Sequence, residues 1–594
     1  MNTRVAAGRL PRFLRKFALR PDTASVAAGA APLIAAHLEA FPRADAGTLL
    51  RAYELAEKCH RGQTRKSGEP YVTHPLAVAT VLAMVGMDTD TVAAAVLHDT
   101  VEDTDLTLYE VAAGFGPGVA ALVDGVTKLD GSRWGKAVAE AETYRKMIVA
   151  ADDDLRVLVI KIADRLHNLR TIGGHPKVEK RQSVARQSLQ LLVPLARRLG
   201  LYVFVREMED LALAALEPRA YERTRELIRS TAAERADEME RAADGIRRAL
   251  AAEKLPARVV VRPRHLYSVR EALGDAVDDE DRALTLRAGE AERIAVVVDG
   301  PPESCYAALG VLHGRWIPET SRFRDYIAMP QHNLYRALHT SLHVGNGISA
   351  SVMIRTPEMD RIAEYGIAAQ IRATAGKTGR ASQEAVHRAD LEWLQSILGW
   401  QRLSESSQFL ADARADLGSG GIVTFTPSGA MVRLPKGATG LDFAYAIDPE
   451  TGNDAAGVTV DGKLQPLAAP LRDGQVVEVI PAAYPDQPEE SWLDSALTAQ
   501  ARTHIRSAIA LRRAEEAADA GREEVKVLAD ALGLDLFDLE IDGTALQVGR
   551  RLGYPDLDAL YIAVAGDQVG PDKVAGLLSG EDFAVPAPED APAG

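Results

Sequence analysis

The stretch that decides the fold of the N-terminal region is YVTHPLAVATVLAMVGMDTDTVAAAVLHDTVEDT, residues 71–104. Its apolar residues recur at helical spacing, yet it carries two histidines and several acids. His98 lies four residues before Glu102. Asp99 lies four residues before Asp103, so each pair is expected on one face of a helix. Charged groups in an apolar segment are costly unless they are paired or bind a metal ion.

Two neighbouring stretches add residues of the same chemistry. His74 lies next to Pro75, a favourable first-turn residue for the helix expected there. In DLRVLVIKIADRLHNLRTI, residues 154–172, apolar positions predict a helix with Asp164 and Asn168 on one face. Imidazole and carboxylate ligands suit a divalent cation such as Mn²⁺. Ordinary capped or solvated polar groups are the alternative, and the combined set of histidines and acids favours the metal site.

Composition limits the classes of function. The 594 residues have a net charge of −15 and are 47% apolar, which allows several domains of about 100–200 residues each. The acidic balance disfavours binding of long DNA or RNA through its phosphates. Cys59 and Cys305 give neither a disulfide framework nor a zinc motif, so we expect a cytoplasmic protein. No apolar run approaches the roughly 20 residues of a membrane span.

The chain divides into segments that differ in composition and in the spacing of their apolar residues. An arginine-rich arm precedes a helical region, and a charged helical connector leads to strands that alternate with helices. A linker with a helical patch then precedes a module of short strands with Gly-containing turns, followed by more helices. The expected segments are a disordered arm at 1–25, an all-α domain at 26–216, the connector at 217–258, an α/β domain at 259–372, the linker at 373–420, the β-rich module at 421–481, a helical domain at 482–578 and a disordered tail at 579–594.

Four motifs in the first 200 residues have a common parallel. HRGQTRKSGEPYVTHPLAVA, AAAVLHDTVEDT, LVDGVTKL and IKIADRLHNLRT resemble the all-α HD hydrolase domain of RelA/SpoT homologues, which act on the alarmones ppGpp and pppGpp in the stringent response. The resemblance implies an Mn²⁺-dependent removal of the 3′-pyrophosphate, which leaves GDP or GTP. It implies metal ligands at His74, His98, Asp99 and Asp164, water-activating acids at Glu102 and Asp103, and substrate contacts at Arg65, Lys66, Ser67, Lys161, Asn168 and Thr171.

Positive charge beside this site supports an anionic substrate. Lys161 and Arg165 lie within a turn of Asp164 on the same expected helix. A solvated helix face is the ordinary explanation for two such residues, and both interpretations stay open at this point.

A second region resembles the synthetase domain of the same family. CYAALGVLHGRWIPETSRFRDYIAMPQHNLYRALHTSLHV and IRTPEMDRIAEYGIAAQ match a nucleotidyltransferase-like α/β domain that transfers pyrophosphate from ATP to GDP or GTP. Only Glu290 stands at the aligned place of one metal-binding acid, and Ser351 replaces the other. Mg²⁺ commonly uses only one or two protein carboxylates, so the loss of one of the two leaves little to hold the ion. We therefore expect this domain to be inactive. Residual nucleotide contacts are implied at Arg262, Arg324, Asn333, Tyr335 and His339.

The β-rich module also has a parallel in the family. IVTFTPSGAMVRLPKGATGLDFAYAID resembles its TGS domain, a small β-grasp fold. Asp448 stands where the family pattern has a histidine. A carboxylate facing RNA phosphate is electrostatically unfavourable, which disfavours contact with tRNA or the ribosome. A regulatory module without an RNA role is the other interpretation.

The sequence therefore predicts a multidomain hydrolase. Its expected activity is Mn²⁺-dependent (p)ppGpp 3′-pyrophosphohydrolysis, with the synthetase-like domain inactive or regulatory. A bifunctional synthetase and hydrolase is the first alternative. A regulator that only binds nucleotide, and a hydrolase for another nucleotide phosphate, are the others. The oligomeric state stays open.

Overall fold

The computed structural model describes residues 26–65, 68–127, 136–274, 288–330, 335–345, 349–374, 392–401, 406–418, 421–482 and 488–580. The chain forms two compact units. One comprises Met1–Gln401 with Glu405–Gly418, and the other comprises Arg402–Ser404 with Ser419–Gly594. Lys66, Ser67, Asn333, the arm at 1–25 and most of the tail at 579–594 lie outside the described residues.

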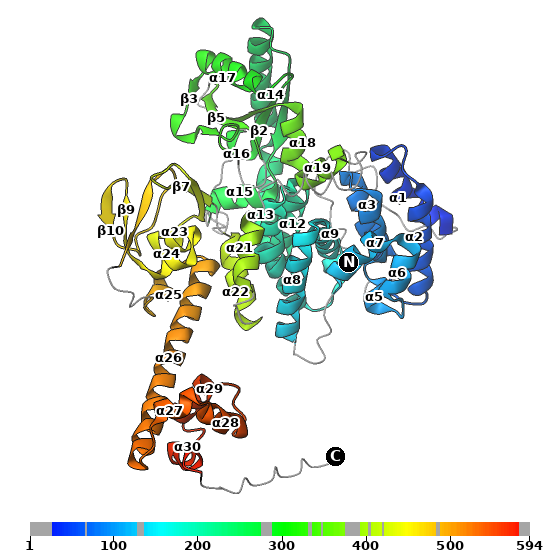
Figure 1. The fold of residues 1–594 in the computed structure, drawn as a ribbon. Coiled ribbons are helices and arrows are strands. Elements are labelled where there is room, and N and C mark those ends of the chain that lie inside the picture. The colour runs from blue at the N-terminus through cyan, green and yellow to red at the C-terminus, as the bar shows by residue number, and fades with distance from the viewer. Residues whose placement is uncertain are drawn as a thin grey trace. The chain divides into compact units, whose positions relative to one another are not determined.

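The first unit begins with a helical domain (Figure 1). Its core is formed by α3, α4, α7 and α9, which contact one another through alanine, valine and leucine side chains. Local signals start several of these helices, such as the Asp88 cap of α4 and the Thr107–Glu110 capping box of α6. The helices are α1 Val26–Ala40, α2 Ala46–Cys59, α3 Thr73–Val85, α4 Thr89–Leu97, α5 Thr100–Asp103, α6 Leu108–Phe115, α7 Pro117–Val126, α8 Lys136–Asp153, α9 Arg156–Thr171, α10 Val178–Gln187, α11 Val193–Arg198 and α12 Tyr202–Leu216.

The helix expected around His98 and Asp99 is divided in two. His98 ends α4 and Asp99 begins α5, although both residues keep helical backbone angles. The Asp103 amide still donates to the Asp99 carbonyl at 2.9 Å. The expected four-residue relation between Asp99 and Asp103 is therefore present across this junction.

A mixed sheet forms the second domain of this unit. Its strand order is β1-β2-β6-β5-β3, and β4 pairs with β5. Among the described strands of this sheet, β2 and β6 form a parallel pair and the other pairs are antiparallel. The strands are β1 Ala257–Pro263, β2 Glu292–Val298, β3 Ile317–Pro318, β4 Arg324–Asp325, β5 Leu338–His343 and β6 Ser349–Arg355, and the helices are α13 Pro218–Ser230, α14 Ala232–Ala252, α15 Leu266–Leu273, α16 Ala288–Ala291, α17 Glu303–Arg315, α18 Pro357–Tyr365 and α19 Ile367–Thr374.

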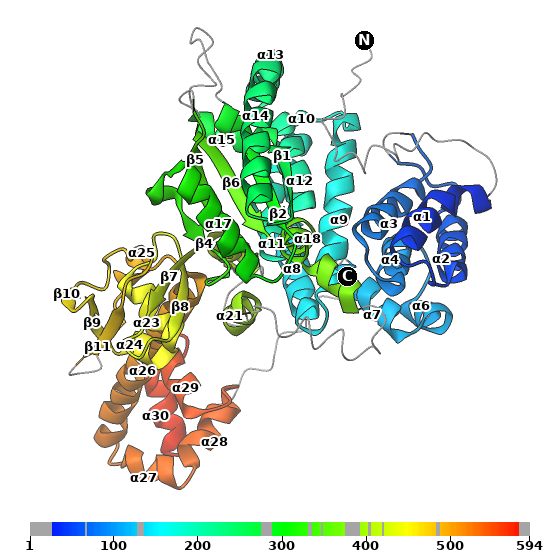
Figure 2. The same ribbon diagram turned by 90° about the horizontal axis from the view of Figure 1, so that it is seen from above.

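One face of this sheet is the hydrophobic core, covered by α14 and α17 (Figures 1 and 2). α14 lies in the stretch expected to be a solvated connector. Its Met239, Ala243, Ile246 and Leu250 are all buried in the core of the sheet domain. These residues repeat at helical spacing between charged neighbours, so α14 is a layer of this domain and the connector interpretation does not describe it.

Two further helices complete the first unit. α21 (Glu392–Gln401) and α22 (Ser406–Gly418) fall in the segment expected to be a linker with a helical patch. Both contact α8 of the helical domain, and Trp400 and Phe409 are fully buried. The helical patch is thus part of a folded unit.

The second unit combines a small β-rich domain with helices. β7 (Gly421–Phe425) and β8 (Met431–Pro435) form a hairpin, and β10-β9-β11 form a second sheet. The long helix α26 leads away from this domain to a cluster of short helices (Figure 1). The remaining bounds are β9 Ala455–Val460, β10 Lys463–Gln465, β11 Val477–Pro481, α23 Gly440–Ile447, α24 Pro449–Asn453, α25 Trp492–Ser495, α26 Ala499–Ala531, α27 Leu536–Ile541, α28 Thr544–Arg551, α29 Leu557–Ala565 and α30 Pro571–Leu578.

The predicted fold class is confirmed: a helical domain, a mixed-sheet domain, a small β-rich domain and C-terminal helices. Within the described residues, no helix is both long enough and apolar enough to cross a bilayer.

Candidate metal centre and active site

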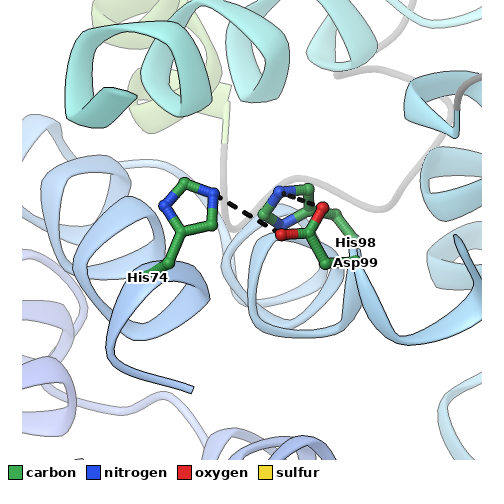
Figure 3. A group of neighbouring side chains, drawn as sticks. All are labelled: His74, His98 and Asp99. Carbon is green, nitrogen blue, oxygen red and sulfur yellow. Dashed lines mark ion pairs between the residues drawn. The ribbon is translucent and has the colours of Figure 1, made fainter. Parts of the chain in front are cut away.

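Three of the predicted metal ligands come together where α3 approaches the α4–α5 junction. His74 is in the first turn of α3, and His98 and Asp99 form the junction. Ligand atoms of these three buried residues all lie within 4.8 Å of one another. The Asp99 carboxylate lies between the two imidazoles, with Oδ2 3.5 Å from His74 Nε2 and Oδ1 3.1 Å from His98 Nε2 (Figure 3).

Asp164 on α9 adds a second carboxylate. Its Oδ1 lies 3.1 Å from His74 Nε2, and its Oδ2 lies 3.3 Å from Lys161 Nζ. The structure therefore brings the four predicted ligands together from α3, the α4–α5 junction and α9.

The chemistry of this set fits a divalent cation. A hydrogen bond from His98 Nδ1 to the Ala95 carbonyl oxygen, at 2.8 Å, fixes the imidazole ring. Nε2 is therefore the nitrogen that faces the site. That buried Nε2 faces Asp99 Oδ1 at 3.1 Å. A buried imidazole nitrogen beside two carboxylates is the kind of ligand set that a histidine- and oxygen-ligated metal ion requires.

The charges of the site are strongly coupled. Burial favours the neutral form of His98, but Asp99 outweighs it and raises the pKa of His98 to about 9. Burial likewise favours the neutral acid at Asp99 and Asp164. The charge and hydrogen bond of His98 outweigh it at Asp99, and Lys161, His74 and His98 together outweigh it at Asp164. The pKa of both carboxyls is therefore held below the ordinary range. Both acids are therefore ionised and available to a cation at neutral pH.

Sequence reasoning did not single out His167, which supports His74 from behind. The Nδ1 atoms of the two rings are 2.8 Å apart, and Arg65 Nη1 is 3.2 Å from the same His167 nitrogen. Because Arg65 is a donor only, His167 Nδ1 is an acceptor, so His74 carries its proton on Nδ1. That tautomer leaves the lone pair of His74 Nε2 toward the metal site. Burial, with the nearby His74 and Arg65, lowers the pKa of His167 to about 3 and keeps it neutral.

Tyr71 is a second residue that sequence reasoning did not single out. Its hydroxyl is 2.7 Å from Asp103 Oδ2 and 3.1 Å from Asp99 Oδ2. Burial, followed by the charge of Asp99, raises the pKa of Tyr71, so it stays a hydrogen-bond donor. It links the predicted acid Asp103 to the metal-site carboxylate. The other predicted acid, Glu102, is half-buried on the same turn of α5.

A cavity of about 720 Å³ opens beside these residues. Its wall includes His74, Asp99 and Asp164 together with four of the predicted substrate contacts, Arg65, Lys161, Asn168 and Thr171. It also includes residues that sequence reasoning did not assign, among them Tyr144, Met147, His175 and Lys180. Arg165 lines it as well, with Nη2 3.3 Å from the Tyr144 hydroxyl. The cavity therefore joins a metal-ligand cluster to a wall rich in cations.

The polar contacts on this wall are interlinked. The Asn168 amide donates to Asp164 Oδ1 at 2.7 Å and accepts from Arg65 Nη2 at 3.1 Å. The Thr171 hydroxyl donates to the carbonyl oxygens of the preceding turn of α9. One face of α9 thus serves both the metal ligands and the cavity.

The predicted nucleotide residues of the sheet domain are partly brought together. Tyr335 and His339 are hydrogen-bonded, with the tyrosine hydroxyl 2.6 Å from His339 Nε2. Tyr335 is only 9% exposed, so this implied nucleotide contact is covered in this conformation. Arg262 is paired with Asp360 and Glu364 on α18. Arg324 lies apart in β4, exposed, and donates to the Ser321 and Phe323 carbonyls.

The acid predicted at residue 290 does not begin the strand. Glu290 is exposed in the short helix α16, whereas Glu292 is the first residue of β2. Ser351 and Met353 lie in β6, and Met353 pairs with Ala295 of β2. Ala295, Ser351 and Met353 therefore offer no carboxylate at the centre of the sheet.

In the β-rich domain, Asp448 has a local structural role. It ends α23, begins α24, and accepts a hydrogen bond from the Thr451 amide at 3.2 Å. This use as a helix cap accounts for an acid at this position without an RNA partner.

Three domains along the chain match known protein families. Residues 52–202 match the HD domain, residues 290–377 match the region found in RelA / SpoT proteins, and residues 422–481 match the TGS domain. These matches follow the same order as the three resemblances seen in the motifs.

Curated relatives match most of the chain. A "GTP pyrophosphokinase" of Streptomyces coelicolor is 40% identical over 565 residues, covering 91% of this chain and 66% of the relative. A "Bifunctional (p)ppGpp synthase/hydrolase RelA" of Mycobacterium tuberculosis is 41% identical, covering 93% and 74%. A "Guanosine-3′,5′-bis(diphosphate) 3′-pyrophosphohydrolase" of Vibrio cholerae is 39% identical, covering 82% and 67%. The chain thus spans about two thirds to three quarters of the length of these relatives.

Proposed function

The chain belongs to the RelA/SpoT family, and on that premise we propose that it hydrolyses ppGpp and pppGpp at the helical domain, releasing GDP or GTP and pyrophosphate. The observation that carries this proposal is the convergence of two imidazoles and two carboxylates at the edge of a cavity whose wall is cationic. A metal-ion site beside cationic side chains suits a substrate that carries several phosphates.

In this proposal His74, His98, Asp99 and Asp164 hold one Mn²⁺ ion. When bound, such an ion lowers the pKa of a coordinated water and polarises a phosphoryl oxygen. His167 fixes the tautomer of His74, and the Ala95 carbonyl fixes that of His98. Both rings are therefore oriented before any substrate arrives.

The acids of α5 receive the proton of the attacking water. Asp103 is the better placed, since Tyr71 connects its carboxylate to that of Asp99. The Tyr71 hydroxyl fixes the direction of the Asp103 carboxylate, which leaves the second oxygen of that group for the water. Glu102 lies on the same turn and orients the water with it.

The cationic wall binds the substrate. Arg65, Lys161 and Arg165 neutralise phosphate charge, and Asn168 and Thr171 contribute polar contacts. Lys161 and Asp164 form an ion pair that an arriving phosphate would compete for. Lys66 and Ser67 are proposed to contact the nucleotide as well.

The direct test is ppGpp hydrolysis by the full chain with Mn²⁺ and after its removal by EDTA. Asp99→Asn and Asp164→Asn each remove a ligand charge while keeping the side-chain shape, and we expect each to lower kcat by about a hundredfold or more. Asp105→Asn is the matched control, because Asp105 is an exposed acid of the same loop outside the site. Full activity in either ligand variant, or full activity in EDTA, contradicts the proposal.

A second activity is favoured by the names of several relatives, which are GTP pyrophosphokinases. In that case the sheet domain would transfer pyrophosphate from ATP to GDP. We propose instead that this domain is inactive or regulatory, because Ala295, Ser351 and Met353 supply no metal-binding acid at the centre of the sheet. Incubating the Asp99→Asn variant with ATP, GDP and Mg²⁺ separates the two, since hydrolysis then cannot hide newly made ppGpp.

A further inference from the structure

Asp103, the acid proposed to receive the proton of the attacking water, is exposed at the end of a short helix. It is the last residue of α5, which has only four residues. Packing does not fix the direction of an exposed carboxylate, and such a side chain moves among its staggered rotamers unless hydrogen bonds hold it. The alignment of this acid with a water molecule therefore depends on the groups that bind Asp103.

Two side chains of the loop between α2 and α3 bind Asp103. The Tyr71 hydroxyl donates to Asp103 Oδ2 at 2.7 Å, and Gln63 Nε2 donates to the Asp103 carbonyl oxygen at 3.2 Å. Gln63 and Tyr71 are also joined to each other, because the Tyr71 amide donates to the Gln63 carbonyl oxygen at 3.0 Å. One pair of residues therefore holds Asp103 both at its carboxylate and at its main chain.

His60 contacts both members of this pair. It is buried at the C-terminal end of α2, where its amide donates to the Ala56 carbonyl oxygen at 3.0 Å. Its Nδ1 lies 2.8 Å from Gln63 Oε1. Its ring stacks on the Tyr71 ring, with the ring centroids 4.7 Å apart and the planes at 26°. One buried side chain, fixed by the end of a helix, thus touches both groups that hold Asp103.

The hydrogen bonds from His60 to α5 run in one direction. The Asp103 carbonyl oxygen can only accept, so Gln63 turns its amide nitrogen to that oxygen and its own oxygen to His60. His60 Nδ1 therefore carries a proton and donates it to Gln63 Oε1. A reversed Gln63 amide would place two acceptors face to face at Asp103. The imidazole thus selects the amide orientation that supports α5.

On the basis of the proposed hydrolase function, we propose that His60 is a positioning residue for that reaction. It holds the main chain of α5 through Gln63 and the Asp103 carboxylate through Tyr71, so that the free oxygen of Asp103 faces the attacking water. His60 is not among the described residues that line the cavity, and it contacts neither the metal ion nor the substrate. It acts only through Asp103.

A buried histidine that only stabilises the fold is the ordinary alternative, and His37 is such a residue in the same domain. It is fully buried, its Nε2 lies 3.0 Å from Thr89 Oγ1, and its ring centroid lies 5.2 Å from that of Phe41. His37 therefore matches His60 in burial, in its hydrogen bond and in its ring contact. These contacts join α1 to the start of α4 and do not involve α5, so His37 is the matched control for lost stability.

The test measures ppGpp hydrolysis by full-chain variants in Mn²⁺. We expect His60→Ala and Gln63→Met each to lower kcat by about tenfold or more, because a misplaced base loses part of its contribution. KM for ppGpp and the affinity for Mn²⁺, followed by electron paramagnetic resonance, should stay within about twofold. His60→Asn offers a donor in place of Nδ1 and should recover part of kcat. His37→Ala should lower Tm and leave kcat unchanged.

Two further readouts separate positioning from stability. If His60 acts through Asp103, adding His60→Ala to Asp103→Asn should lower kcat by less than about twofold, whereas independent effects would multiply. In the metal-free protein, hydrogen exchange of the Asp103 and Thr104 amides at the end of α5 should be faster in His60→Ala and unchanged in His37→Ala.

The outcomes separate this role from the proposed function. Absence of ppGpp hydrolysis in the native chain overturns the proposed function and the role of His60 with it. Hydrolysis that Asp103→Asn abolishes and that both His60→Ala and Gln63→Met leave intact overturns only the role of His60. The same holds for a loss that multiplies with that of Asp103→Asn, or one confined to KM, Mn²⁺ affinity or Tm. If His60→Ala does not fold, Gln63→Met decides the question, since Gln63 is only partly buried.

Discussion

His167 shows how a residue that binds neither metal nor substrate in the proposed mechanism can still control the site. It accepts the Nδ1 proton of His74 and shares Arg65 with the substrate wall. Its position three residues after Asp164 on α9 is a signal that the sequence contained. That signal acquires meaning only when α3 is packed against α9, which no local pattern specifies.

We expect His167→Ala to weaken Mn²⁺ binding by about 10–100-fold, because partners behind a metal-ligating histidine typically have effects of this size. His167→Gln keeps a hydrogen-bond acceptor and should recover part of the affinity. Mn²⁺ titration followed by electron paramagnetic resonance measures this without any turnover. His175→Ala is the matched control, since His175 lines the same cavity and its Nδ1 accepts a hydrogen bond from the Lys177 amide. Equal affinities in all four proteins would show that His74 needs no such support.

His339 makes stability sensitive to acid. Burial, with Arg293 and Arg355 nearby, lowers its pKa to about 4 in the folded protein, whereas an unfolded histidine titrates near about 6.5. Between these values the unfolded chain binds a proton that the folded chain does not. Stability is therefore lost as pH falls from about 6.5 to 4, and it is fully present above that range.

The corresponding prediction is that His339→Gln unfolds less readily in acid. Glutamine accepts the Tyr335 hydrogen bond and does not titrate. The fall in Tm between pH 7 and pH 5 should be smaller in the variant than in the native protein. His313→Gln serves for comparison, because His313 lies in the same domain but is less buried and has no arginine acting on its pKa. An unchanged pH dependence in His339→Gln would contradict this account.

At the scale of elements, the sequence predicted what is local and missed what depends on packing. The helix over 154–172 and its Asp164–Asn168 face were predictable, because periodicity and four-residue spacing are properties of one helix. The break between α4 and α5 was not, since His98 and Asp99 both keep helical angles. The role of α14 was also missed, because its apolar residues are few among many charges and become a core only against the sheet. The contacts of Tyr71 and His167 were missed for the same reason, because they form only when separate elements pack together.

Gly125 allows α7 to lie close to α9, the helix that carries Asp164. A Cβ atom at this position would lie 2.7 Å from Val157 Cγ2 and 3.2 Å from Ala150 Cβ. We expect Gly125→Ala to destabilise the helical domain by about 1–3 kcal/mol through overpacking. Hydrogen exchange of α7 and α9 measures it.

Two comparisons isolate the cause. Gly114→Ala in α6 meets nothing within 4 Å and should be neutral or slightly stabilising, as alanine is in a helix. Adding Val157→Ala to Gly125→Ala should recover part of the loss, since the clash is mainly with that side chain. A double variant as unstable as the sum of both single variants would assign the effect to something other than this contact.

At the scale of the whole molecule, the wall of the cavity depends on a distant part of the chain. α8 supplies Thr143, Tyr144 and Met147 to the cavity. On another side α8 is covered by α21 and α22, where the Arg145 guanidinium lies 4.9 Å from the centre of the Phe409 ring. Arg198 also donates to the Asp416 carbonyl at 2.7 Å. Residues after 391 thus support a site formed by residues before 190.

This arrangement predicts where the chain can be shortened. A chain ending at Gly418 keeps the first compact unit whole and should retain the ppGpp hydrolase rate and the Tm of that unit. A chain ending at Gln401 loses α22 and exposes α8, so we expect a lower Tm and a raised KM. Phe409→Ala in the full chain should reproduce this effect, with a loss of about 3–5 kcal/mol for a buried phenylalanine. Leu417 is 5% exposed on the same helix, and Leu417→Ala should act in the same direction with a smaller loss. If the chain ending at Gln401 matched the one ending at Gly418 in both Tm and KM, α22 would be dispensable and the cavity wall would hold its shape through the helical domain alone.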